Sequence, residues 1–220
     1  MTVFAPESDK HVSAVIAQSW HRCSKYMQRD NWQAPHQAQG LTYASICRRK
    51  TALLTIGQAT LEDAWEYMAN RPCALFILDE SACILNRCGD AQTLLDLEKL
   101  GLQEGSYCAE SIIGTCALSL AALEGQPLKT SREQHFKRAL HPWSFCSTPI
   151  FDNHGRLFGS IALACHLSGS GALRSLAYAF CCPGNRQFTV NRQFVSRFQP
   201  PSEPALWPAG EHGRRRHGVE

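Results

Sequence analysis

The sequence lacks any run of about 18 apolar residues, so we expect no membrane-spanning helix. Its first residues, MTVFAPESDK, lack the basic and then apolar segments of an export signal, which favours a cytoplasmic protein. The net charge of +3 is too small to argue for nucleic-acid binding. The chain also has no GxxxxGK[ST] loop, no Gly-x-Ser-x-Gly turn and no acidic pair suited to acid–base catalysis. We therefore expect that the protein is not an enzyme.

Cysteine is abundant, with 11 residues, but its spacing matches no known kind of cysteine site. There is no CxxC motif and no Cys/His pair with zinc-finger spacing, so we expect no bound metal and no cofactor. The odd number, without an export signal, also argues against a disulfide framework. We interpret most cysteines as small buried side chains. The alternative is a thiol or metal site formed by residues that could converge in the fold: His135, His141, Cys108, Cys116 and Cys146.

Hydrophobic periodicity predicts a helix over residues 10–28 and a second from Thr42 to about Asn70. Asp90 is the predicted N-cap of a third helix, which Gly101 ends, and a fourth covers Ile112–Gly125. Short apolar runs bounded by turn residues predict strands at Cys73–Glu80, Cys83–Gly89, Gln126–Thr130, Ser144–Asp152 and Arg156–Cys165. Hairpins on both sides of a helical middle predict an α+β fold with helices packed on an antiparallel sheet.

Two phrases, GTCALSLAALEGQPLKT and STPIFDNHGRLFGSIALA, resemble the GAF domains of acetoin- and glycerol-type regulators. The matching positions are Gly114, Thr115, Ala117, Leu118, Gly125, Pro127, Pro149, Ile150, Asp152, Gly155, Gly159 and Leu163. The phrases SWHRC, PHQAQG and LEDAWEYMA extend the likeness to one family. They resemble the N-terminal sensor region of the transcriptional activator of the dihydroxyacetone kinase operon, also called the glycerol metabolism operon regulator. The resemblance covers roughly residues 10–166.

This resemblance implies a helical N-terminal extension over residues 1–70 and a GAF domain core over residues 72–166. It also implies a signal-input region that controls dihydroxyacetone and glycerol metabolism genes and docks dihydroxyacetone kinase subunits. Full-length members of that family carry an ATPase domain and a DNA-binding domain, which have no counterpart in this sequence. We therefore expect no direct DNA binding by this chain. A homodimer through the helical extension is a further option.

The composition changes after about residue 167. Five of the 11 prolines lie in Ser168–Glu220, which has no lysine and no aspartate and ends in an Arg-rich stretch. Our hypothesis is that residues 167–220 are an atypical, disordered tail that arose from a frameshift near codon 168. A natural Pro/Arg-rich disordered tail is the alternative.

Two sets of residues are candidates for a functional site. A GAF-type ligand pocket between the sheet and the covering segment Gly105–Gly114 would be lined by Phe76, Leu78, Tyr107, Cys108, Ile113, Cys116, Phe145 and Ile161. Partner docking would use the large apolar side chains that lie outside the sheet: Trp20, Trp32 and Trp65. Docking of a protein partner is the favoured function. The alternatives are a GAF-type small-molecule sensor and, more distantly, a thiol-dependent reductase with the GAF fold.

Overall fold

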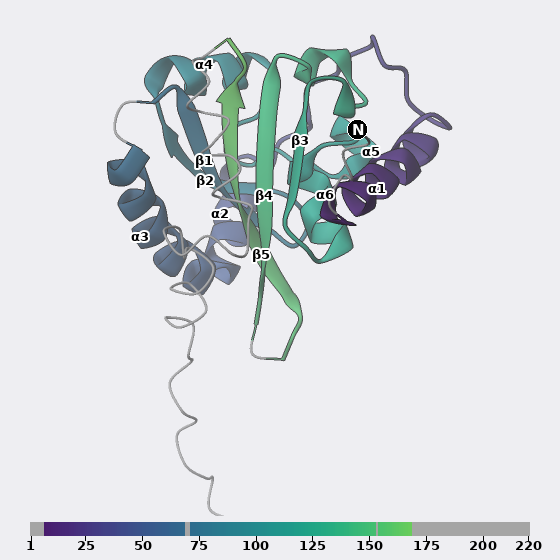
Figure 1. Ribbon diagram of the computed structural model, residues 1–220. Coiled ribbons are helices and arrows are strands. Elements are labelled where there is room, and N and C mark those ends of the chain that lie inside the picture. Colours follow the sequence, from purple (N-terminus) through teal and green to yellow (C-terminus); the bar gives the residue numbers. More distant parts are fainter. Residues whose placement is uncertain (1–6, 69–70, 153, 169–220) are drawn as a thin grey trace, which may run out of the picture.

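A computed structural model describes residues 7–68, 71–152 and 154–168 (Figure 1). The N-terminal helices are α1 (Glu7–Cys23), α2 (Gly40–Arg49) and α3 (Thr51–Met68). The first hairpin and the helices after it are β1 (Cys73–Asp79), β2 (Ile84–Gly89), α4 (Ala91–Lys99), α5 (Glu110–Ile113) and α6 (Ala117–Glu124). The last elements are β3 (Leu128–Ser131), the short 3-10 helices η1 (Arg132–Gln134) and η2 (Arg138–Leu140), β4 (Trp143–Phe151) and β5 (Leu157–His166).

The five strands form one antiparallel sheet in the order β2-β1-β5-β4-β3. The sheet therefore brings the two predicted hairpins together through β1 and β5, whose paired residues lie 80 or more positions apart along the chain, from Asp79 with Gly159 to Cys73 with Cys165. All seven residues of β1 are buried, because helices cover both faces of the sheet at this strand. The predicted antiparallel α+β sheet is confirmed.

Each face of the sheet packs against its own set of helices (Figure 1). On one face, Leu75 and Ile77 of β1 lie in a cluster with Leu53 and Leu61 of α3. On the other face, the cluster joins sheet residues to α4, α5, α6 and the loop that precedes α5. Gly159 allows the close approach of α3, since a Cβ atom there would lie 2.5 Å from the Leu78 carbonyl oxygen and 2.6 Å from a Leu53 methyl carbon.

The single helix predicted for Ile112–Gly125 is wrong in detail. The structure breaks it into α5 and α6 at Gly114, whose φ of +76° and ψ of −162° suit glycine far better than other residues. Because of this break, the buried Thr115 hydroxyl faces α1, where it meets the side chains of Ser19 and Cys23. The left-handed Gly125 at the end of α6 is as predicted.

A cluster of five polar side chains fastens α1 to α5, and we call it the Glu110 cluster. The Arg22 guanidinium donates two 2.8 Å hydrogen bonds to the Glu110 carboxylate, a bidentate pair. The Ser19 hydroxyl donates to the same carboxylate and lies 2.7 Å from the Thr115 hydroxyl. The Cys23 thiol lies 3.8 Å from that hydroxyl. The N-terminal helix is thus tied to the helices that cover the sheet.

Apolar contacts accompany this polar link. Val15 of α1 packs in a small buried cluster with Leu120 and Ala121 of α6 and Leu128 of β3. Figure 1 shows α1 beside α5 and α6 and away from α2 and α3. The two helical parts of the predicted extension therefore lie on opposite sides of the sheet, α3 directly against one face and α1 on the helices that cover the other.

The bounds of the N-terminal helices differ from the prediction. The helix expected over residues 10–28 ends at Cys23. The helix expected from Thr42 to Asn70 is two helices, α2 and α3, separated at Lys50. The Thr51 hydroxyl donates a 2.8 Å hydrogen bond to the Arg48 carbonyl, which offers the backbone a local alternative to a continuous helix.

Other expectations have different outcomes. Asp90 caps α4 as predicted, and its carboxylate accepts a 2.9 Å hydrogen bond from the Thr93 backbone. Most of the tail predicted for residues 167–220 lies outside the described residues, since these end at residue 168. The boundary between an extension ending at residue 70 and a core starting at residue 72 stays a proposal.

The Glu110 cluster predicts a large effect of one substitution. Glu110→Ala leaves the partly buried Arg22 guanidinium and the buried Ser19 hydroxyl without their acceptor, so we expect the free energy of unfolding to fall by about 2 kcal/mol. Urea denaturation followed by circular dichroism measures this change. Asp96→Asn, which removes the negative charge of an exposed Asp96–Lys99 pair, is the control and should leave the unfolding curve unchanged. Equal curves for Glu110→Ala and the control would contradict the assignment.

Candidate functional site

Most of the side chains predicted to line a ligand pocket pack together on one face of the sheet. Six of the eight lie in the same buried cluster, each with 0% of its surface exposed: Phe76, Leu78, Cys108, Ile113, Cys116 and Phe145. The structure therefore brings these six together, between the strands and the α5–α6 cover. In this structure they fill the sheet–helix interface as core residues. Their role in ligand binding stays a prediction.

The other two predicted pocket residues lie on the opposite side. Ile161 pairs directly with Ile77 and packs in the cluster under α3, so it does not share a face with Phe76. Successive residues of a strand point to opposite faces, and the prediction chose the wrong parity for β5. Tyr107 packs against that same α3-side cluster, and its ring stacks on His36 at 4.8 Å between centroids.

Two buried hydroxyl groups on the face of the six core residues were missed by the sequence analysis. Ser160 is paired with Leu78, and Ser147 is paired with Ala162, so both belong to the Phe76 face. Both residues are fully buried, and within the described part of the chain neither hydroxyl has a hydrogen-bond partner. A buried hydroxyl without a hydrogen-bond partner costs free energy. A small polar ligand that hydrogen-bonded to these two hydroxyls would recover that free energy.

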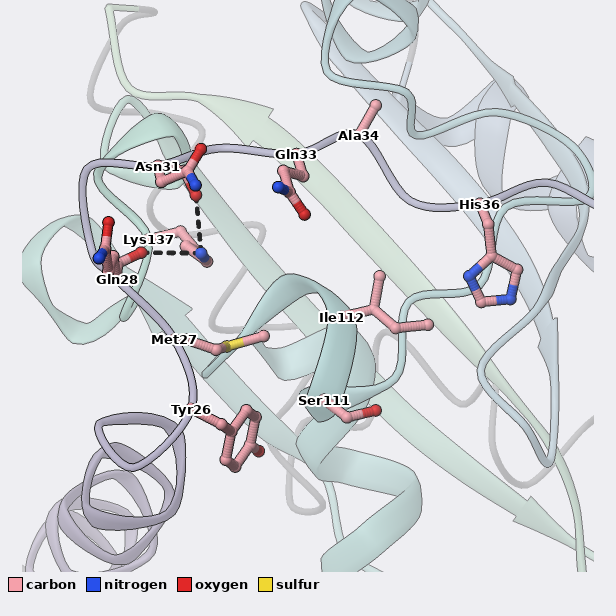
Figure 2. A pocket seen from close by; sticks show the side chains of 10 residues that line it. All are labelled: Tyr26, Met27, Gln28, Asn31, Gln33, Ala34, His36, Ser111, Ile112 and Lys137. Atoms are coloured by element: carbon pink, nitrogen blue, oxygen red, sulfur yellow. Dashed lines mark hydrogen bonds between the residues drawn. The ribbon is translucent and has the colours of Figure 1, made fainter.

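The structure contains a hollow that the sequence analysis did not predict (Figure 2). Its volume is about 580 Å³, within the range of small-molecule sites. It lies outside the sheet–helix interface, between α5 and the segment that joins α1 to α2. We call this segment, residues 24–39, the connector. Its lining residues are Tyr26, Met27, Gln28, Asn31, Gln33, Ala34, His36, Ser111, Ile112 and Lys137. Hydrophobic periodicity predicted a helix for the first part of the connector, up to residue 28, and the connector was not identified from the sequence as one wall of a site.

Lys137 is the residue that holds the connector in place. Its ammonium group donates 2.8 Å hydrogen bonds to the backbone carbonyls of Gln28 and Asn31 (Figure 2). Next to it, the Arg138 amide donates to the Arg29 carbonyl, and the Arg138 side chain pairs with Asp30 at 2.8 Å. Burial lowers the pKa of Lys137 below its usual value.

The three tryptophans predicted as docking residues lie in three different places. Trp20 donates its indole hydrogen to the Gln134 carbonyl and packs against Phe136, with the Arg29 guanidinium 4.4 Å from its ring centre. Trp32 packs against the cluster on the Phe76 face, and Trp65 packs against the cluster under α3. Each is half-buried. The structure does not bring the three into one surface, and their part in docking stays a prediction.

The residues of the alternative thiol or metal site do not converge either. Cys146 lies in the cluster under α3, whereas Cys108 and Cys116 lie in the cluster on the other face of the sheet. Burial raises the pKa of the Cys116 thiol to about 12 and that of Cys108 well above its usual value. Among the described residues, no group of three or more His, Cys, Asp or Glu side chains is arranged to hold a metal ion.

The fold defines a class: an antiparallel five-stranded sheet with helices on both faces, and a covering segment broken at a glycine, is an α+β domain. A model of the GAF domain matches residues 52–176. The chain therefore belongs to the GAF domain family, as its sequence resemblance predicted. The match begins at the start of α3, within the segment predicted as an extension.

Two curated relatives are highly similar to most of the chain. The chain is 75% identical over 165 residues to the glycerol metabolism operon regulatory protein of Citrobacter freundii, covering 75% of this chain and 26% of that protein. It is 66% identical over 154 residues to the PTS-dependent dihydroxyacetone kinase operon regulatory protein of Escherichia coli, covering 70% of this chain and 24% of that protein. The chain thus spans about a quarter of the length of these curated relatives. The family predicted from the sequence is confirmed.

One solved structure is also highly similar to this chain. The crystal structure of the Escherichia coli DhaR(N)–DhaL complex is 56% identical, with a TM-score of 0.71. The match covers 83% of this chain and 63% of that one. The predicted fold class, a GAF domain with helices packed on an antiparallel sheet, is confirmed. Within the described residues, no helix has the length and apolar character needed to cross a membrane.

His135 predicts how stability depends on pH. Its ring is buried, and burial lowers its pKa to about 4 from the usual 6.5. Between these values the unfolded chain binds a proton that the folded chain does not, so stability falls as the pH falls from 6.5 to 4, by roughly 3 kcal/mol in total. Urea unfolding at pH 7 and pH 4.5 measures this loss.

The control for this pH effect is a pair of histidine substitutions. His135→Gln removes the titrating group and should flatten the pH dependence, whereas His154→Gln, at an exposed position, should leave it as in the original protein. An unchanged pH dependence in His135→Gln would show that other groups cause the loss.

Proposed function

We propose that this chain is the signal-input region of a bacterial transcription activator that controls dihydroxyacetone and glycerol metabolism genes. We further propose that it works by docking a subunit of dihydroxyacetone kinase. The names and high identity of the two regulatory relatives support the first part. Because the chain spans only about a quarter of their length, the activity of a whole activator is not assigned to it.

One observation carries the docking proposal. The solved N-terminal region that resembles this chain over 83% of its length is described as part of a complex with DhaL. At 56% identity and a TM-score of 0.71, the two domains share one fold and more than half of their aligned residues. The family resemblance in the sequence implies kinase subunits as partners. Both lines therefore point to a protein effector, recognised by the surface of the domain.

The tryptophans fit this proposal in a supporting role. Each is half-buried and packs against other side chains of this chain, so none projects into solvent as an anchor for a partner. We propose that Trp20, Trp32 and Trp65 shape the surface that the partner meets. Large side chains that project further lie elsewhere, and Tyr26 at the mouth of the hollow is 56% exposed.

The proposal also covers activity and location. The relatives are regulatory proteins by name, which supports a chain without catalytic activity. Because a transcription activator must meet DNA and its effectors in the same compartment, we place the chain in the bacterial cytoplasm. A dimer through the N-terminal helices remains part of the proposal as an option.

A second candidate function is small-molecule sensing in the sheet–helix interface. The two unpartnered hydroxyls of Ser147 and Ser160 favour it, since they lie beside the side chains of Phe76 and Leu78 on the same face. A ligand there would have to displace packed core side chains. Docking is the better supported function.

Docking predicts a direct interaction between purified proteins. Titration of this chain with purified DhaL in a calorimeter should give a saturable complex at micromolar concentrations. Pre-saturation of DhaL with the N-terminal region of the Escherichia coli regulator should abolish the signal, because the two domains would compete for one surface. Absence of any complex, or a complex that the competitor leaves intact, would contradict the docking proposal.

The reductase alternative makes the opposite prediction about two thiols. Because burial raises the pKa of both Cys108 and Cys116, we expect neither to react with iodoacetamide at pH 7.5 in the folded protein. Mass spectrometry of peptides after a timed reaction measures this, with the urea-unfolded chain as the positive control. Rapid labelling of either cysteine, together with reduction of methionine sulfoxide by the protein, would support the reductase alternative.

A further inference from the structure

The lining of the hollow is rich in hydrogen-bond donors and lacks acids. Of its ten lining residues, none is Asp or Glu, and Lys137 is the one lysine or arginine. The side chains of Gln28, Asn31, Gln33, His36 and Ser111 each carry an N–H or O–H group. A wall of donors around a cation is suited to a group that offers several acceptor oxygens and negative charge.

Lys137 carries an uncompensated charge at this hollow. Only 6% of the residue is exposed, and its two hydrogen bonds go to neutral backbone carbonyls. An ammonium group has three hydrogens, so one donor is left beyond these two bonds. Among the described residues, no carboxylate lies within ion-pair distance of it. A buried cation without a counter-ion is costly, and an anion bound beside it would relieve that cost.

The charged side chains around the hollow also favour binding of an anion. Arg22 and Arg138 are neutralised by Glu110 and Asp30. Arg29, in the connector itself, has no carboxylate partner among the described residues, and its Nε hydrogen has no acceptor there. The local field is therefore positive, which raises the concentration of anions at the hollow.

We propose that this hollow binds the oxyanion group of a small molecule, a carboxylate or a phosphate, with Lys137 as its ion-pair partner (Figure 2). The Ser111 hydroxyl and the connector amides supply further hydrogen bonds. The site is separate from the sheet–helix interface, since it lies on the outer side of α5. The proposal goes beyond kinase-subunit docking, because it gives the domain a chemical input at the segment that joins α1 to α2.

Inorganic phosphate and succinate are the probes, and each represents one of the two oxyanion groups. The melting temperature of the full chain is followed by differential scanning fluorimetry as either salt is added, with ionic strength held constant by sodium chloride. A bound anion stabilises the folded state as its concentration rises. We expect one of the two salts to raise the melting temperature saturably, and this salt identifies the group. No saturable rise with either salt would overturn the proposal.

Two variants test the position of the site. Lys137→Met should weaken the apparent affinity for that salt about 10-fold or more, because a charged hydrogen bond is lost. Ser111→Leu places a larger side chain in the hollow from an exposed position and leaves the two Lys137 hydrogen bonds in place. It should therefore fold and block binding, and it tests the site independently of whether Lys137→Met folds. Lys129→Met removes the same charge from β3, away from the hollow, and should bind as the original chain does. Equal stabilisation of all three variants would mean an adventitious ion only, and would overturn the proposal.

Discussion

The link between α1 and the start of α5 is the interaction on which the placement of α1, the connector after it and the hollow depends. Glu110 accepts hydrogen bonds from Ser19 and Arg22, and Thr115 meets Ser19 and Cys23, across at least 88 residues of sequence. The geometry exists because Gly114 breaks the covering helix and turns Thr115 towards α1. With α1 fixed, the connector after it is carried across α5, where Lys137 holds its carbonyls. The hollow is the space left between these two segments.

The elements of the sheet could be predicted because each strand is a short apolar run between turn residues, and this signal is local. The face of a strand residue is harder to predict, since an error of one position moves a side chain to the other side of the sheet. This is how Ile161 was placed with Phe76 while its pair, Ile77, packs under α3. Contacts such as Glu110 with Ser19, or Lys137 with two carbonyls, have no sequence signature, because neither periodicity nor spacing relates residues so far apart.

The family features in the sequence have physical roles in this structure. Gly114 and Thr115 create the attachment point of α1, and Gly159 lets α3 approach the sheet. Asp152 organises the β4–β5 turn by accepting hydrogen bonds from the His154 and Arg156 backbone. The resemblance to the GAF domain therefore rests on residues that determine the fold, while most residues of the hollow, Lys137 among them, lie outside the phrases that carry the family resemblance.

The central claim is that α1 is an integral part of this domain, held through Glu110, and that it fixes the connector. Hydrogen–deuterium exchange of the original chain and of Glu110→Ala tests it most directly. The account predicts that amides of α1 are protected to the same degree as those of α6 in the original chain. In the variant, α1 and the connector should lose protection together while the sheet keeps it. Free exchange of α1 in the original chain, or a variant that leaves the exchange of α1 and the connector unchanged, would contradict the account.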